Sequence, residues 1–331
     1  MKKRTKKNFF VRNKKLLYIL FGVIVICVSF VLFAAQSYFA KARNTVQISM
    51  QQMINPFQAE VSSAAIPDAK IAYYTRGTGS PIILLPGFGM TMHDWDPLFL
   101  EQLSLHHQLI ILDFRGVGNS TGSTGSLSQK QLTEDVIAFM NTMKLKKATI
   151  LGWSMGSFIA QDVAEQYPKR VNKLILVGTG PGGDEQIGAS ESISTKIQDN
   201  LDGSWEAVYV PFLFSTDQAK KAYLVRLKNA EQTKEIPNVA SESTETKLAF
   251  ERAFAFADEE SARNASLSAI KAPTLIISGA KDKLVPVSNA KKTAARIPGS
   301  KLAIIPAAGH AVLFEKPYEV TTLINTFIEK K

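Results

Sequence analysis

The sequence predicts an α/β protein whose sheet is mostly parallel and doubly wound, with helices on both faces. Short apolar runs alternate with stretches of helical spacing, and this alternation is typical of parallel sheets. A second observation, a serine between two glycines directly after one apolar run, indicates a strand that turns sharply into a helix. The runs predicted to be strands are 69–75, 81–85, 108–113, 148–151, 173–177, 273–279 and 302–306.

The predicted helices separate these strands in the first half of the chain. Residues 128–143 place Val136, Ile137 and Met140 on one face, and residues 157–164 continue the chain after the serine turn. The alternation stops between residues 181 and 270, where helical stretches are rich in aromatic residues. We expect most of these aromatic side chains to pack against one another within the segment: Trp205, Tyr209, Phe212, Phe214, Tyr223, Phe250, Phe254 and Phe256.

The charge of the chain is concentrated at its beginning. Of 39 lysine and arginine residues, eight lie in residues 1–15, which contain no acidic residue. The remaining 31 basic residues face 29 acidic ones, so the rest of the chain is close to neutral. With 331 residues, 45% of them apolar, the chain can form a substantial core with an insertion. No nucleic-acid partner is predicted, because the folded part has no basic cluster.

The segment Leu16–Ala35 follows the basic tail and holds twenty residues without a charge. As a helix it would span about 30 Å, the thickness of a bilayer core. We therefore predict a basic cytoplasmic tail at 1–15, a transmembrane helix at 16–35 inserted in the bilayer, and a stalk with the entry to the first strand at 36–67. This single-pass arrangement places the rest of the chain outside the cytoplasm. The alternative is a signal peptide cleaved near residues 40–42, AKA, which would give a secreted protein.

Residues 152–156, GWSMG, form the serine turn. The apolar run before them and the helical pattern after them are the context of a nucleophile elbow, a tight turn that lifts a serine hydroxyl clear of the backbone. A Cβ atom at Gly152 or Gly156 would collide with the neighbouring strand or helix. Ser154 is therefore the candidate nucleophile.

An acid and a base follow Ser154 in chain order. Asp282 comes after the predicted strand 273–279, and His310 comes after 302–306, so both lie at the strand edge where α/β sheets carry ligands. His310 is the only histidine beyond Asp282. Of the other three, His106 and His107 are expected at the surface. His93 lies near the expected mouth of the site, as a plain loop residue or as a substrate contact.

The stretch from Asp68 to Lys331 resembles the α/β-hydrolase superfamily, in its cofactor-free, cap-bearing branch. Residues 152–156 are similar to its elbow, and 113–120, DFRGVGNS, resemble its D-x-R-G-x-G-x-S loop. Residues 279–282, GAKD, followed by Val285-Pro286, resemble its acid loop. Gly309-His310 followed by 315–317, EKP, resembles its histidine loop.

This resemblance implies an α/β-hydrolase core at 68–180 and 271–331 with a helical cap at 181–270. It also implies an oxyanion hole formed by the backbone N–H groups of Phe88 and Met155. The chain departs from the family at Pro86, where most relatives have histidine, and at Ser157, where many have glycine. The change at Pro86 leaves the backbone N–H group of Phe88 as a donor. At position 157 a small residue such as serine fits.

These residues predict a serine hydrolase that cleaves an ester, lactone, thioester or amide through an acyl-enzyme. The expected substrate is a small molecule with an apolar acyl or lactone part, held under the aromatic cap. The sequence has no H-E-x-x-H, C-x-x-C or Walker loop, so we expect neither a metal ion nor an organic cofactor. Two alternatives stay open: a non-catalytic binding module at the cell surface, and an activity like that of cofactor-free haloperoxidases or carbon–carbon bond hydrolases. The oligomeric state is not predicted.

Overall fold

The chain divides into two units, Met1–Pro56 and Phe57–Lys331. The computed structural model describes residues 57–125, 127–200, 205–238 and 266–330, all of which belong to the second unit. The predicted tail, the predicted membrane helix and most of the predicted stalk lie outside the described residues. Within the described ranges, no helix combines the length and the apolar character that a membrane span requires.

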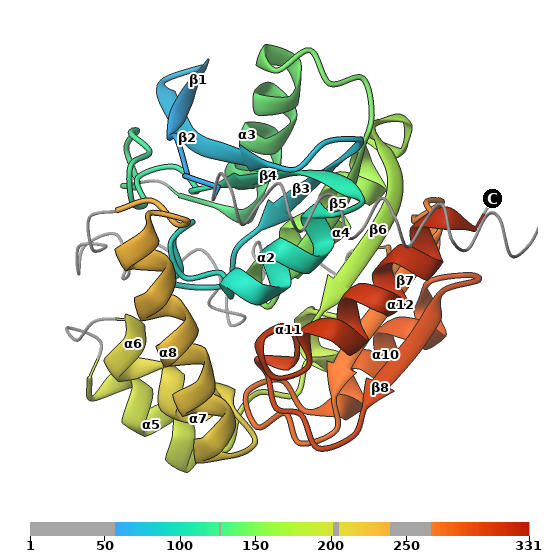
Figure 1. Ribbon diagram of the computed structural model, residues 1–331. Coiled ribbons are helices and arrows are strands. Elements are labelled where there is room, and N and C mark those ends of the chain that lie inside the picture. The colour runs from blue at the N-terminus through green and yellow to red at the C-terminus, as the bar shows by residue number, and fades with distance from the viewer. Residues whose placement is uncertain (1–56, 126, 201–204, 239–265, 331) are drawn as a thin grey trace, which may run out of the picture. The chain divides into compact units, whose positions relative to one another are not determined.

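The described residues form an α/β structure around one eight-stranded sheet (Figure 1). The strand order is β1-β2-β4-β3-β5-β6-β7-β8, with β2 antiparallel to both of its neighbours and all other pairs parallel. This confirms the predicted, mostly parallel sheet. The strands are β1 Ser62–Ile66, β2 Ala69–Arg76, β3 Ser80–Leu85, β4 His107–Leu112, β5 Ala148–Trp153, β6 Val171–Val177, β7 Thr274–Gly279 and β8 Lys301–Ile305.

Helices cover the sheet on both faces, which produces two buried layers. Ile82 and Leu84 of β3 pack in one cluster with residues of α2, α11 and α12, and Ile83 and Leu85 pack in the other with α3, α4 and α10. In Figure 1, α2 and α12 lie in front of the sheet. These helices are α2 Pro97–Ser104, α3 Gln129–Thr142, α4 Met155–Gln166, α10 Val287–Arg296, α11 Val312–Glu315 and α12 Pro317–Glu329.

All seven predicted strands are confirmed, with ends that differ by at most two residues. The eighth, β1, lies inside the predicted stalk at 36–67, and no sequence pattern above predicts it. Its residues read SSAAI and only Ala64 is buried, so it carries neither the alternation nor the apolar run of a typical strand. Pairing with β2 places β1 in the sheet.

The structure corrects the prediction for His107, which is buried rather than at the surface. This residue begins β4, and its side chain lies under α12, where Nε2 is 3.1 Å from Oδ1 of Asn325. Burial lowers the pKa of the His107 imidazole, because a charged ring is poorly solvated there. The neighbouring His106 is exposed, as predicted.

Within the described part of the predicted cap, four α-helices follow β6 along the chain. They are α5 Glu191–Gln198, α6 Trp205–Val208, α7 Val210–Leu213 and α8 Asp217–Thr233. Helix α8 packs against α2 and α11 of the core. The Tyr223 ring of α8 is stacked on Phe314 of α11, with ring centroids 5.2 Å apart, and Tyr209 lies edge-on to Phe88 at 5.6 Å. Tyr209 and Tyr223 thus contact the core, whereas packing within the cap is what we expect for most of the aromatic residues of this segment.

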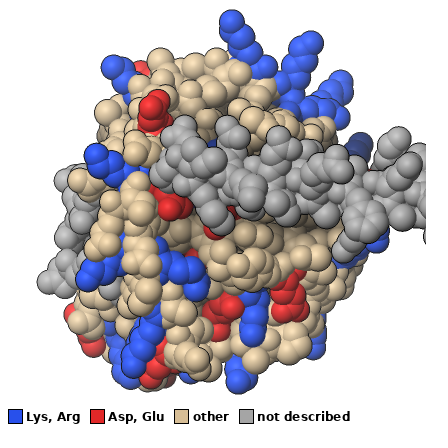
Figure 2. Space-filling model, viewed as in Figure 1, with Lys and Arg blue, Asp and Glu red and all other residues tan. Residues whose placement is uncertain are grey.

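The charged side chains on the visible face are mixed in sign. Figure 2 shows lysine and arginine beside aspartate and glutamate over its lower half. Ion pairs account for part of this mixing, such as Lys220 with Asp217 in α8.

Candidate active site

The turn after β5 has the strained geometry of a nucleophile elbow. Ser154 has φ 52° and ψ −121°, a backbone conformation that costs free energy in a residue other than glycine. Its N–H group donates to the carbonyl of Val177 at 2.8 Å, which ties the turn to β6. A Cβ atom at Gly152 would overlap the carbonyl of Gly156 in α4, and one at Gly156 would overlap the carbonyl of Leu85 in β3. The predicted need for both glycines is confirmed.

Asp282 and His310 lie side by side beyond the ends of β7 and β8. Asp282 Oδ2 is 2.7 Å from His310 Nδ1, and the two side chains are 1% and 2% exposed. Because a carboxylate only accepts, Nδ1 is the donor, which leaves Nε2 for another partner. Oδ1 of Asp282 accepts the N–H groups of Leu284 at 3.0 Å and Val285 at 2.8 Å. The carboxylate is therefore held from two sides.

Ser154 and His310 line the same small cavity of about 120 Å³. A larger cavity of about 480 Å³ also reaches Ser154 but not His310. The two share Phe88, Ser154 and Leu284. The small cavity is lined by Gly87, Phe88, Trp153, Ser154, Ile197, Tyr209, Leu213, Leu284 and His310. The large cavity is lined by Phe88, Ser154, Met155, Phe158, Gly183, Gln186, Gly188, Ala189, Leu284 and Val285.

Phe88 and Met155, the predicted oxyanion-hole residues, flank Ser154. Met155 is the first residue of α4, and the first N–H groups of a helix have no acceptor within it. Phe88 follows β3 in the loop that contains Gly89, which has φ 64°. Both residues line the large cavity beside Ser154.

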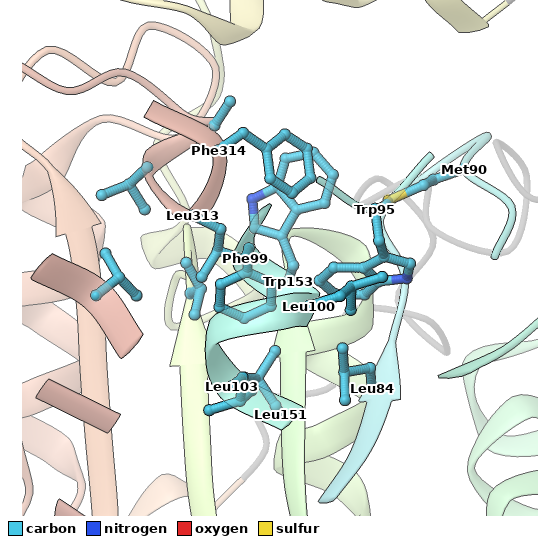
Figure 3. Packing of buried hydrophobic residues seen from close by; sticks show 14 of the residues in the cluster. Leu84, Met90, Trp95, Phe99, Leu100, Leu103, Leu151, Trp153, Leu313 and Phe314 are labelled. Atoms are coloured by element: carbon cyan, nitrogen blue, oxygen red, sulfur yellow. The ribbon is translucent and has the colours of Figure 1, made fainter. Parts of the chain in front are cut away.

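The loop that carries His310 is held by contacts that the sequence analysis missed. Trp153 Nε1 donates to the carbonyl of His310 at 3.0 Å, and the two rings lie 5.4 Å apart. Figure 3 shows Trp153 beside Phe314, with ring centroids 5.0 Å apart. A Cβ atom at Gly178 would lie 2.8 Å from Cε1 of His310, so glycine leaves room for the ring. Trp153 occupies the variable position of the G-x-S-x-G pattern, which carries no signal of this role.

Glu315 joins the histidine loop to the cap. Its Oε1 accepts the N–H groups of Gly309 at 2.6 Å and Ser215 at 3.0 Å, while Oε2 accepts the Ser215 hydroxyl at 2.5 Å. Ala311 donates its N–H group to the carbonyl of Leu213 at 2.9 Å. Residues between α7 and α8 thus fix the loop on which His310 lies. Glu315 was recognised in sequence only as part of a family match.

Asp113 is buried in a structural turn away from both cavities. Its carboxylate accepts the N–H groups of Met92 at 2.6 Å and Asn119 at 3.0 Å. Burial raises the pKa of Asp113 to about 7, because desolvation disfavours the charged form more than the two donors favour it. The turn is closed by Ser120, whose hydroxyl donates to the Asp113 carbonyl.

His93 contacts the end of α8 rather than either cavity. Its Nδ1 is 2.9 Å from the carbonyl of Pro237, and its Nε2 is 3.0 Å from Oε1 of Glu231. The substrate-contact alternative for His93 receives no support from the cavity linings. Among the described residues, no group of three or more histidine, cysteine, aspartate or glutamate side chains could hold a metal ion.

Comparison with known proteins identifies the class. Residues 80–317 match the family described as alpha/beta hydrolase fold. The chain is 30% identical over 265 residues to pimeloyl-[acyl-carrier protein] methyl ester esterase of Serratia marcescens, which covers 77% of this chain and 97% of that protein. It is 25% identical over 285 residues to the putative non-heme bromoperoxidase BpoC of Mycobacterium tuberculosis, which covers 78% of this chain and 97% of that protein.

A solved structure agrees with this assignment at the level of the fold. The enol-lactonase of Burkholderia xenovorans superposes with a TM-score of 0.67 at 24% identity, covering 81% of this chain and all of that chain. The chain therefore belongs to the α/β-hydrolase family. It is an enzyme of this family, of the carboxylic-ester-hydrolase type.

Proposed function

We propose that this chain is a membrane-anchored serine hydrolase that cleaves an ester, lactone, thioester or amide through an acyl-enzyme. One observation carries the proposal. His310, which pairs with Asp282, and the strained Ser154 border the same cavity, although the three residues come from three separate strand ends. A nucleophile, a base and a group that orients the base are the parts that acyl transfer needs.

In the first half of the reaction, Ser154 Oγ attacks the substrate carbonyl carbon while its proton passes to Nε2 of His310. Asp282 keeps the Nδ1 proton in place and stabilises the imidazolium that forms. The new oxyanion accepts hydrogen bonds from the N–H groups of Phe88 and Met155. The intermediate then collapses, the bond to the leaving group breaks, and His310 returns the proton to the leaving atom.

In the second half, water attacks the acyl-enzyme. His310 takes a proton from this water as the oxygen bonds to the carbonyl carbon, and the oxyanion forms again between Phe88 and Met155. Collapse releases the acid and returns the proton to Ser154. Neither half of the reaction needs a redox partner, because the substrate, the water and these side chains account for every proton and every bond.

The first prediction tests the nucleophile. Ser154→Ala should lower the turnover of an activated ester by about four orders of magnitude or more and abolish labelling by a fluorophosphonate. The matched control is Ser194→Ala, an exposed serine on α5 that lines neither cavity and should keep full activity. Unchanged turnover in purified Ser154→Ala would contradict the proposal. A wild-type protein that neither hydrolyses esters nor takes the label would favour the non-catalytic binding module.

A second candidate function is a cofactor-free haloperoxidase-like activity. The relative named as a putative non-heme bromoperoxidase supports it. The test is halogenation of monochlorodimedone with hydrogen peroxide, bromide and acetate, which supply the oxidant, the halide and the acyl group. Activity that disappears in Ser154→Ala and exceeds ester hydrolysis would make this the main function.

The second prediction concerns the membrane anchor. Because residues 16–35 carry no charge and can span a bilayer, the chain should remain in the membrane fraction after a carbonate wash, with an intact mass that includes this segment. The basic tail should keep the N-terminus in the cytoplasm and the hydrolase outside it. A soluble form that begins near residue 43 would instead indicate a secreted enzyme. Protection of the hydrolase part from added protease in intact cells would contradict the orientation.

A further inference from the structure

The two cavities at Ser154 differ in size and in their access to His310. The small cavity, of about 120 Å³, contains His310, and the large one, of about 480 Å³, does not. In acyl transfer the histidine must protonate the leaving atom, so the leaving group has to lie on the side of His310. The acyl part then extends to the other side of Ser154.

We propose that the enzyme is selective for esters of small alcohols that carry a longer, uncharged acyl chain. This inference rests on the proposed function and deepens it. The small cavity takes the alcohol and the large cavity takes the acyl chain. The small cavity has about a quarter of the volume of the large one, so a long alkyl chain is better accommodated in the large cavity.

The lining of the large cavity indicates an acyl chain without charge. Phe158, Met155 and Leu284 supply apolar surface, and none of the described lining residues is charged. Gln186 is the one polar side chain in this lining besides Ser154. Its amide is engaged with its own loop, since Oε1 accepts the N–H of Gly182 at 3.4 Å and Nε2 donates to the carbonyl of Ile187 at 3.3 Å. A terminal carboxylate would find no cation among these described lining residues.

Cap residues set the size of the small cavity. Ile197 of α5, Tyr209 just before α7 and Leu213 of α7 line it together with His310. Leu213 is fixed by the hydrogen bond from Ala311, and Tyr209 by its contact with Phe88. The alcohol site is therefore narrow because the cap is attached to the histidine loop.

Two isomeric esters test the proposal with the purified full chain in detergent. Methyl nonanoate and octyl acetate have the same formula and differ only in which side of the ester carries the long chain. Burying one methylene group is worth about fourfold in affinity, so several methylenes that fit only the large cavity give a large ratio. We expect kcat/KM for methyl nonanoate to exceed that for octyl acetate by about 50-fold.

Two variants, one for each cavity, test which part of the ester each cavity binds. Ala189→Trp partly fills the large cavity and should lower the ratio of methyl nonanoate to methyl butanoate turnover about tenfold. Ile197→Ala enlarges the small cavity and should raise octyl acetate turnover relative to methyl nonanoate by about fivefold. Ile193→Ala, one helical turn earlier on α5 and outside both linings, is the matched control and should leave the ratio unchanged.

The outcomes separate this inference from the proposed function. Fluorophosphonate labelling of Ser154 with equal turnover of the two isomers, or with a preference for octyl acetate, would overturn the cavity assignment alone. A protein that hydrolyses no ester and takes no label would overturn the proposed function and the assignment together. A ratio that Ile193→Ala changes as much as Ile197→Ala does would also overturn the assignment.

Discussion

The nucleophile elbow and the histidine loop are held in place by different kinds of interaction. Ser154 is positioned by backbone groups, namely the Val177 carbonyl and the close approach that Gly152 and Gly156 permit. His310 is positioned mainly by side chains, namely Trp153 and Asp282 from distant parts of the chain and Glu315 of the neighbouring helix α11, which contacts the cap. Backbone contacts with the neighbouring strands β3 and β6 therefore hold the nucleophile, whereas the base depends on side chains and on the cap.

The cap helix α8 is also held to the core by side chains from distant parts of the chain. Arg226 of α8 pairs with Asp96 at 2.6 Å and donates to the carbonyl of Phe314 at 2.7 Å, while the Tyr223 hydroxyl donates to the carbonyl of Asp94. Asp96 is fully buried at the start of α2, and breaking a buried ion pair is costly. Helix α8 is therefore fixed to the core beside the histidine loop.

The largest effect on catalysis should come from replacing Asp282, the buried aspartate that contacts His310. A second buried aspartate, Asp113, is the control. Asp282→Asn should lower kcat by about 10⁴-fold, because an amide can favour the wrong imidazole tautomer. Asp113→Asn leaves both cavities untouched and should lower kcat less than about tenfold. Steady-state kinetics on variants with matched circular dichroism spectra provide the measurement. The reverse ranking would show that the acid is Asp113.

Asp113 should instead appear in the pH dependence of stability. Its pKa is about 7 in the folded chain and 3.8 as a free side chain, so the folded state binds more protons between these values. Its contribution is present below pH 4 and is lost as the pH rises to 7, by up to about 4 kcal/mol. Urea unfolding of wild type and Asp113→Asn from pH 4 to pH 8 measures the difference. Parallel pH profiles of the two proteins would contradict the raised pKa.

A smaller loss of kcat than that of Asp282→Asn is expected at Glu315, which positions the loop of His310 without taking part in the reaction. Glu315→Ala removes the acceptor of Gly309 and Ser215 and should lower kcat about 30-fold with little change in KM, because a small misplacement of the base is costly. Glu315→Gln keeps an acceptor and the size of the side chain, so it should retain most activity. Equal activity in wild type and Glu315→Ala would show that the loop holds its shape without the cap.

Much of the sheet and the nucleophile could be predicted because their signals are local. Apolar runs with short polar borders mark seven of the eight described strands, and the glycines of residues 152–156 mark a tight turn that is recognisable in the sequence. The strand β1 escaped prediction because SSAAI has no pattern of its own, and pairing with β2 decides its structure. His107 was placed at the surface because its burial depends on α12, more than two hundred residues later in the chain.

The sequence by itself determined the fold class, the elbow serine and the order of the candidate acid and base, since these depend on periodicity, on tight turns and on which strand each residue follows. Only the tertiary structure decided that Asp282 and His310 meet at 2.7 Å and that Glu315 ties their loop to the cap. It also decided that Ser154 borders two cavities of unequal volume. The physical reason is that contacts between residues far apart in the chain form only when the layers pack, and packing leaves no periodic trace in the sequence.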